Sequence, residues 1–231
     1  MKTLIASLTI ALACFGLYYC NTQSTLTATE YDMYVFAVQW GRTMCLSGYE
    51  GCDEKVLQIP KNKISIHGLW PNKKSGAYVP DCNQGAEIEI VDDGSDIFSF
   101  LHTYWPSLNQ NTNEYFWGHE FNKHGYCYSE DYKEYFEATK DVFFEKRIGD
   151  IITDIWGNQV GNYSIPYNEF TSKLTERLGG QYFTPKCKQF NGKYFLSELR
   201  LSFDLDFNYI EAKLGNSCKS GKDIVIPFAN E

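Results

Sequence analysis

Two short segments contain three of the four histidines of the 231-residue chain. Residues 116–127 read Phe116-Trp117-Gly118-His119-Glu120-Phe121-Asn122-Lys123-His124-Gly125-Tyr126-Cys127, and residues 66–71 read Ile66-His67-Gly68-Leu69-Trp70-Pro71. The second of these follows residues that alternate polar with apolar, as a strand does, and the first is typical of a helix. The two segments therefore predict a strand and a helix that together bear the main cluster of titratable groups.

The longer segment places its charged groups on one side if it is helical through His124. At 100° per residue, His119, Glu120, Lys123 and His124 lie at about 0°, 100°, 40° and 140°. All four then occupy less than half of the circumference. Imidazole titrates near neutral pH and lysine adds a fixed positive charge. Such a helix face can therefore offer an anion both hydrogen-bond donors and an acid/base pair.

A catalytic metal fits this segment poorly. A His-Glu pair also begins the zinc-protease motif, which needs its second histidine four residues after the first. Here Lys123 occupies that position, and His124 is five residues after His119. We therefore expect no metal and no cofactor. His102 lies in a different setting, because its neighbours Thr103 to Trp105 offer no partner group, and we expect it to be structural.

The rest of the chain predicts helices placed between strands. Strands are expected at Tyr31–Trp40, at Lys63–His67 with His67 at its end, and at 194–196, 198–203, 207–212 and 224–226. Helices are expected from Ser95-Asp96 to near Pro106, over 113–123, from Ser129-Glu130 to about Arg147, and over 167–178 before Gly179-Gly180. The absence of regular alternation predicts an α+β fold: a central antiparallel sheet with several helices packed around it, stabilised by disulfides.

Composition and charge restrict the class of protein. The chain is 43% hydrophobic and 22% charged and shows no internal repeat, so we expect a single domain over residues 25–231. The formal charge of −8 excludes a broad basic surface for long nucleic acid, DNA included. An anionic ligand must then bind in a local pocket.

The first residues predict a secretory signal. A charged start and an apolar run form a signal peptide over residues 1–20, with cleavage between about 16 and 24. The run is short for a membrane span, although an uncleaved anchor stays open as an alternative. We expect no membrane association after cleavage. Asn162-Tyr163-Ser164 is a standard N-glycosylation sequon.

Six cysteines follow the predicted signal, which in a secreted chain indicates three disulfides. Fifteen pairings are open, although the separation of Cys45 and Cys52 by seven residues favours a local loop. Structural zinc is the weaker alternative, because the sequence contains no Cys-x-x-Cys.

Both histidine segments resemble the two active-site signatures of the ribonuclease T2 family of secreted acid ribonucleases. The matches are His67-Gly68-Leu69-Trp70-Pro71, and then His119-Glu120 with Lys123-His124-Gly125 and Cys127. Val38-Gln39-Trp40 with Cys45 resembles the family's first core strand, and Tyr104-Trp105-Pro106 resembles the end of a helix before the second signature. The similarity runs from about Tyr31 to the C-terminus and is thinner after Gly149.

The resemblance implies a role for each matched residue in metal-free cleavage of single-stranded RNA. His124 would be the general base at the ribose 2′-hydroxyl, and His67 the general acid at the departing 5′-oxygen. His119 would hold the phosphate, while Glu120 and Lys123 would stabilise the phosphorane. The products would be 2′,3′-cyclic phosphates and then 3′-phosphates, formed with an acidic pH optimum.

Base recognition and the disulfides also follow from the resemblance. Aromatic stacking would hold the bases, with Trp70, Tyr78 and Phe116 as candidates. Asn72 stands where the family usually has Asp, so the preferred base is open. Phe121 and Tyr126 replace a usual Trp and a usual small hydroxyl residue, which affects packing only. The implied disulfides are Cys45–Cys52, Cys82–Cys127 and Cys187–Cys218.

Other classes of function remain as alternatives. A secreted RNA-binding or signalling protein without turnover would use the same pocket, although intact His67 and His124 argue against it. A secreted metalloprotease would be inhibited by a chelator. We expect a monomer, located outside the cell or in the lumen of a lysosome or vacuole.

Overall fold

The structure is a computed structural model that describes residues 31–46, 52–77, 79–212 and 214–229. The predicted signal peptide over residues 1–20 and the base-binding candidate Tyr78 lie outside these described residues. No helix in the described part of the chain has the length and apolar character needed to cross a bilayer.

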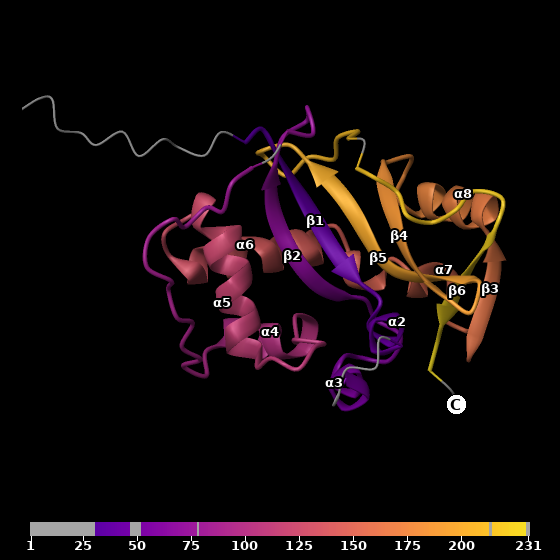
Figure 1. Ribbon diagram of the computed structural model, residues 1–231, viewed down its shortest axis with the longest axis horizontal. Coiled ribbons are helices and arrows are strands. Elements are labelled where there is room, and N and C mark those ends of the chain that lie inside the picture. Colours follow the sequence, from indigo (N-terminus) through magenta and orange to yellow (C-terminus); the bar gives the residue numbers. More distant parts are fainter. Residues whose placement is uncertain (1–30, 47–51, 78, 213, 230–231) are drawn as a thin grey trace, which may run out of the picture.

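A six-stranded sheet forms the centre of the molecule (Figure 1). Its strands are β1 (Met33–Gln39), β2 (Ser65–Asn72), β3 (Asn162–Pro166), β4 (Phe183–Phe190), β5 (Lys193–Phe203) and β6 (Asp223–Pro227). They lie in the order β2-β1-β5-β6-β3, and β4 pairs with β5. Every residue of β1 is buried, as expected for a strand between two neighbours beneath packed side chains.

The sheet is mainly antiparallel, as predicted, and contains one parallel pairing that the sequence did not predict. Four strand pairings are antiparallel, but β5 and β6 are parallel through Tyr194–Ile224 and Phe195–Val225. The physical reason is the length of β5. The second half of β5 pairs with β1, which leaves its first half free on the same edge, and residues 204–222 return the chain to that half.

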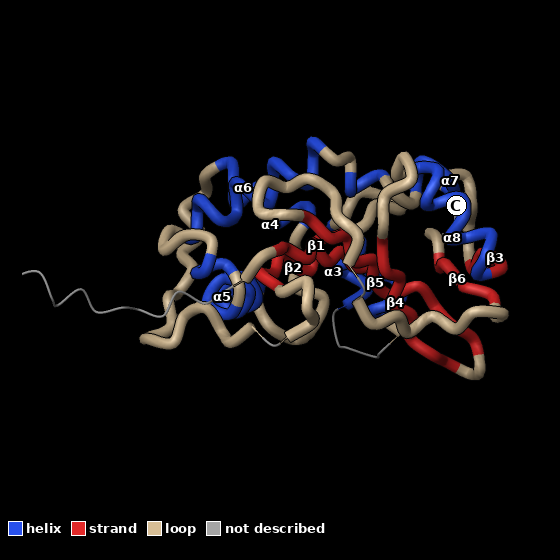
Figure 2. The backbone as a smooth tube through the Cα atoms, turned by 90° about the horizontal axis from the view of Figure 1, so that it is seen from above, coloured by secondary structure: helices blue, strands red, loops and turns tan. Residues whose placement is uncertain are grey.

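Seven α-helices surround the sheet in the described residues, which confirms the predicted α+β class. They are α2 (Gly41–Cys45), α3 (Cys52–Gln58), α4 (Asp96–Tyr104), α5 (Asn113–Lys123), α6 (Tyr132–Glu145), α7 (Thr153–Trp156) and α8 (Tyr167–Arg177). Figure 2 shows α4, α6 and α7 on one side of the strands. There Phe36 of β1 stacks on Phe143 of α6, with ring centroids 6.4 Å apart. The apolar stripe of α6 thus buries one face of the sheet.

Local signals located most helices well. The observed bounds of α4, α5 and α8 agree with the predicted segments, and α6 begins after Asp131, which accepts a hydrogen bond from the Lys133 N–H. The predicted strand over 207–212 is wrong. Asp204 accepts the N–H groups of Asp206 and Asn208 and holds a turn, so that only Tyr209 bridges back to the sheet.

Candidate active site

His67 occupies a β-bulge inside β2, not the end of a strand as predicted. Ala37 of β1 lies opposite Gly68 and Val38 lies opposite Ile66, which leaves His67 as the extra residue. A bulge bends the strand and redirects the side chain that it contains. The carbonyl of His67 accepts a hydrogen bond from the indole of Trp105 at 2.8 Å. Trp105 caps the C-terminal end of α4, so this bond ties the bulge to that helix.

The helix α5 brings the second group of titratable residues to β2. Its first turn is capped by Thr112, whose hydroxyl accepts the Tyr115 N–H, and its apolar side buries Trp117 and Phe121. The helix ends at Lys123, and His124 leaves it with φ −128° and ψ −44°. The predicted 140° position of His124 on a helical wheel is therefore wrong, because His124 caps the helix instead of continuing it.

Trp70 lies between the two histidines that the sequence assigned as acid and base. Its ring centroid is 5.0 Å from that of His67 and 5.4 Å from that of His124. Its indole N–H donates to Glu120 Oε2 at 2.8 Å, which ties β2 to α5. Gly68 makes this contact possible, since a Cβ there would lie 2.2 Å from both Glu120 Oε2 and Trp70 Nε1.

The remaining predicted phosphate-binding groups differ in exposure. Glu120 is buried, with only 3% of its surface accessible, and burial raises the pKa of its carboxyl despite the nearby His67 and the Trp70 hydrogen bond. His119 is exposed on α5, while Lys123 is partly exposed at its end. The structure thus combines a buried carboxyl group with two more exposed side chains, those of His119 and Lys123.

The pKa values of the two central histidines shift in opposite directions. Burial, followed by the positive charges of Lys123, His119 and His67, lowers the pKa of His124 to about 3. Burial also acts to lower the pKa of His67, but the hydrogen bond and charge of Glu198 and the charge of Glu120 outweigh it, so that this pKa is raised. One imidazole therefore stays neutral in the pH range where the other holds a proton.

Glu198 and Arg200 are the site residues that the sequence analysis missed. Glu198 Oε2 lies 2.8 Å from His67 Nδ1, and the Arg200 guanidinium lies 5.0 Å from the Trp70 ring centroid. Both belong to β5. Glu198 lies 131 residues after His67 in the sequence. The available signal was local: two charged residues at alternate positions between leucines in a largely apolar strand.

The base-binding candidates in the described residues belong to β2 and α5. Phe116 lies 6.1 Å from His67 between ring centroids, so it borders the same site as Trp70. Asn72 lies at the far end of β2, where its side-chain oxygen accepts the Lys73 N–H. The structure brings Trp70 and Phe116 together around His67, and Asn72 follows Trp70 by two residues in β2.

Three disulfides link the cysteines in the pairs that the resemblance implies. They are Cys45–Cys52, Cys82–Cys127 and Cys187–Cys218. The second joins the loop after β2 to the short turn that follows His124. In the same region, the N–H of Cys82 donates to the Lys123 carbonyl at 3.0 Å. The loop is thereby fixed to the end of α5.

His102 has partners that its sequence neighbours did not reveal. Together with Asp92 and Glu114 it forms a group whose potential metal-binding atoms lie within 4.8 Å of one another. Asn113 accepts the Ser107 N–H through its oxygen, so its amide N–H points to His102 Nδ1. His102 Nε2 then bears the hydrogen and donates to Asp92 at 2.8 Å. This arrangement fits a structural His–Asp contact and leaves no free imidazole lone pair for a metal.

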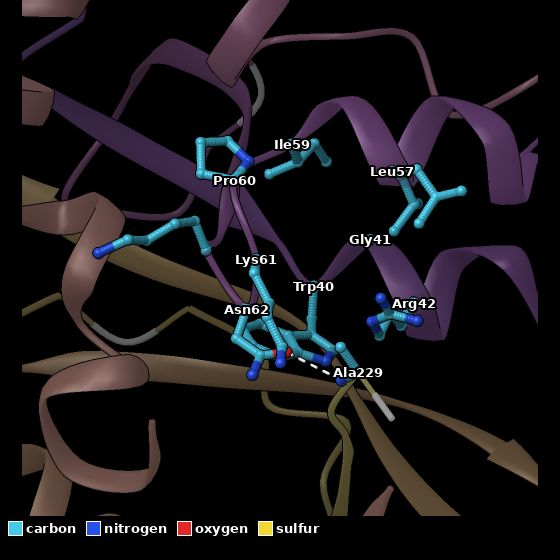
Figure 3. Close-up of a pocket in the computed structure, with 11 residues that line it drawn as sticks. Trp40, Gly41, Arg42, Leu57, Ile59, Pro60, Lys61, Asn62 and Ala229 are labelled. Atoms are coloured by element: carbon cyan, nitrogen blue, oxygen red, sulfur yellow. Dashed lines mark hydrogen bonds between the residues drawn. The ribbon is translucent and has the colours of Figure 1, made fainter. Parts of the chain in front are cut away.

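Two cavities of similar volume differ in the residues that line them. One of about 440 Å³ adjoins His119, between α5 and residues 87–90. Another of about 450 Å³, shown in Figure 3, lies at the end of β1 beside Trp40, Arg42 and Lys61. None of the predicted catalytic or base-binding residues lines this second cavity.

The comparisons agree with the fold and with the family that the sequence resembles. The family model of the Ribonuclease T2 family matches residues 31–218. Ribonuclease Rh from Rhizopus niveus is 30% identical over 221 residues, which cover 88% of this chain and 86% of that protein. Among solved structures, the RNase-related protein from Calystegia sepium aligns with a TM-score of 0.67 and 24% identity, covering 87% of this chain and 98% of that one. Japanese pear S3-RNase aligns with a TM-score of 0.68 and 19% identity, covering 84% and 100%.

The fold and these relatives show that the protein is an α+β endoribonuclease. The chain belongs to the Ribonuclease T2 family.

Proposed function

We propose that the protein is a secreted enzyme that cleaves single-stranded RNA by metal-free transesterification. The observation that supports this most directly is the pair of histidines on either side of Trp70, with pKa values shifted in opposite directions. A neutral imidazole can accept a proton while a charged one donates, which is what a concerted acid/base reaction requires.

In the first step, His124 removes the proton of the ribose 2′-hydroxyl. The 2′-oxygen attacks the adjacent phosphorus, the bond from phosphorus to the 5′-oxygen breaks, and His67 gives its proton to that oxygen. The products are a 2′,3′-cyclic phosphate and a free 5′-hydroxyl. In the second step the roles reverse: His67 deprotonates water, His124 protonates the departing 2′-oxygen, and a 3′-phosphate results.

Three residues of α5 surround the phosphate in this proposal. His119 holds it, and Glu120 and Lys123 stabilise the charge of the phosphorane. Glu120 is held in place for this role by the Trp70 indole N–H at 2.8 Å, and its Oε1 lies 4.0 Å from His67 Nε2. Lys123 adds positive charge at the exposed end of the same helix.

Bases would stack on aromatic side chains next to the reacting phosphate. Trp70 and Phe116 both lie beside His67, which supports them as stacking surfaces. Tyr78 remains a candidate, and Asn72 would contribute an amide further along β2.

Secretion and modification complete the proposal. The signal peptide would be cleaved, and the mature protein would act outside the cell or in a lysosomal or vacuolar lumen. It would act as a monomer and without a cofactor. Asn162 and Ser164 of the sequon are both exposed on β3, which lies at an edge of the sheet, so a glycan fits there away from His67.

The test is cleavage of a short RNA at pH 5 in excess EDTA, with identification of the new terminus. We expect the oxidised wild-type protein to form a cyclic phosphate and His124→Ala to lose about 10²–10⁴ in rate. The matched variant His102→Ala, which removes a histidine from the same chain, should keep full activity. Absence of cleavage by the wild-type protein, or dependence on a divalent metal, would contradict the proposal.

A further inference from the structure

Glu198 reaches His67 across an intervening strand. His67 belongs to β2 and Glu198 to β5, and β1 lies between them. The β1 residue Ala37 pairs with Gly68 on one side and with Arg200 on the other and places only a methyl group there, while the next β1 residue on the same face, Gln39, pairs with Glu198. The bulge at His67 and this small residue let the two side chains meet at 2.8 Å above the sheet.

This contact determines which nitrogen of His67 faces the reaction. Nδ1 donates its hydrogen to Glu198, because a carboxylate can only accept. Nε2 points the other way, 4.0 Å from Glu120 Oε1, and so faces the site where the phosphate would lie. In the charged form of His67, the Nδ1 proton is held and the Nε2 proton is the one available for transfer.

Arg200 holds Glu198 from its other oxygen. Its Nε donates to Glu198 Oε1 at 2.5 Å, and its guanidinium lies over the Trp70 ring. Glu198 has 8% of its surface exposed, and a carboxylate with so little water needs such partners to stay ionised. Burial raises the pKa of Glu198, but His67 and Arg200 together lower it below its ordinary value.

We propose that Glu198 is the positioning residue of the proposed general acid His67, and that Arg200 keeps Glu198 ionised and oriented. The inference rests on the proposed function, since it gives His67 the role of acid. Glu198 does not exchange a proton with substrate. It keeps the Nδ1 hydrogen on His67 while Nε2–H protonates the 5′-oxygen and the phosphorus–oxygen bond breaks.

The charged groups around His67 determine the pH dependence. Glu198 and Arg200 face it from β5, Glu120 faces it from α5, and His124 lies beyond Trp70. The two carboxylates raise the pKa of His67, while Arg200 and burial lower it. Removing the charge of Glu198 therefore lowers this pKa and moves the basic limb of activity to lower pH.

The experiment compares two substrates in Glu198→Gln. One is a dinucleoside monophosphate, whose 5′-oxygen needs a proton to depart, and the other is a nucleoside 3′-(p-nitrophenyl phosphate), whose leaving group departs without one. We expect kcat/KM for the first substrate to fall by about tenfold or more and for the second to change little. The basic limb should move down by about one pH unit. Glu198→Asp should recover part of the activity.

The controls separate this inference from the proposed function. His67→Ala should show the same selective loss, only larger, and Glu169→Gln on the exposed part of α8 should behave as wild type. Equal loss of both substrates in Glu198→Gln, with an unchanged pH profile, would show a structural role and overturn the inference. Equal loss of both in His67→Ala would instead overturn the acid role of His67.

Arg200 has its own test. Arg200→Gln removes the positive charge but keeps a hydrogen-bond donor next to Glu198. We expect the same selective loss on the dinucleoside substrate, smaller than in Glu198→Gln, and no further loss in the double variant, because both act through His67. Independent, multiplied losses in the double variant would show that Arg200 does not act through Glu198.

Discussion

Gly68 shows how a single residue can control this site without taking part in the chemistry. It is buried in β2, directly beneath the hydrogen bond between Trp70 and Glu120. An added Cβ would lie 2.2 Å from an atom of each partner, and Glu120 cannot move away into solvent because it is buried. The glycine is required by close approach and not by its backbone angles.

Gly68→Ala should therefore break the Trp70–Glu120 contact and lower kcat/KM for RNA by about 10²-fold or more, because a displacement near 1 Å at the reacting groups has effects of this size. Cleavage assays together with circular dichroism check this. The matched change Gly76→Ala lies in an open turn and should leave activity intact, although its positive φ of 74° will cost some stability. Full activity of Gly68→Ala would show that the contact does not matter for cleavage.

The opposite pKa shifts of His67 and His124 predict the pH profile. His124 acts as a base only when neutral, so kcat/KM should rise with pH through its pKa of about 3. His67 acts as an acid only when charged, so kcat/KM should fall as pH rises through its raised pKa, above the ordinary 6.5. The profile of kcat/KM from pH 2.5 to 9 measures both limbs. Constant activity between pH 4 and 9 would contradict the assignment.

At the scale of elements, the end of α5 is the most important feature. The helix supplies His119, Glu120 and Lys123, and then ends so that His124 turns toward Trp70. Gly125 follows, and a Cβ there would lie 2.6–2.8 Å from atoms of Phe121 and Tyr135. The turn after α5 is therefore packed directly against the helix α6 and does not have room for a larger residue.

The disulfide Cys82–Cys127 should stabilise this turn and with it the position of His124. It closes a loop with a sequence separation of 45, for which the chain-entropy relation gives about 4 kcal/mol. The double variant Cys82→Ala/Cys127→Ala should lose about that free energy of unfolding and also much of its activity at 25 °C. Urea titration and RNA cleavage measure the two effects.

The disulfide Cys45–Cys52 provides the matched control. Its separation is 7, for which the same relation gives about 2.4 kcal/mol, and it lies between α2 and α3, away from the histidines. Its double alanine variant should lose stability but keep its activity below the unfolding transition. Equal loss of activity in both variants would mean that Cys82–Cys127 has no specific effect on the site.

At the scale of the whole molecule, one hydrophobic cluster connects the left and right parts of Figure 1. It includes residues from Tyr34 in β1 to Phe228 after β6, and it contains side chains of α4, α5, α6, α7 and α8. Elements that share one core unfold together. The single domain over residues 25–231 stays a prediction, which cooperative unfolding would test.

Unfolding in urea with the disulfides intact should therefore be one cooperative transition. Tryptophan fluorescence and far-ultraviolet circular dichroism should give coincident curves. Phe143→Ala, which removes a fully packed ring between α6 and β1, should lower the free energy of unfolding by about 3–5 kcal/mol and move both curves equally. Separate transitions for the two probes would mean that the chain folds as more than one unit.

The local sequence determined the reactive groups and most of the elements that bear them. Spacing and capping residues predicted α4, α5 and α8, because helix formation depends on neighbours three and four residues apart. The two segments with His67 and His124 identified the family. The strands β3 and β4 were not predicted from the sequence. In β4, Pro185 and two lysines interrupt the apolar pattern.

Only the tertiary structure decided how these groups are arranged. The bulge at His67, the turn of His124 out of its helix, the parallel pairing of β6 and the contact from Glu198 all depend on partners distant in sequence. Periodicity within one segment reports which face of an element is apolar, but it contains no information about which other strand lies beside it. Glu198 meets His67 across β1, where His67 bulges out of register next to the small residue Ala37, and this is a property of strand order and register.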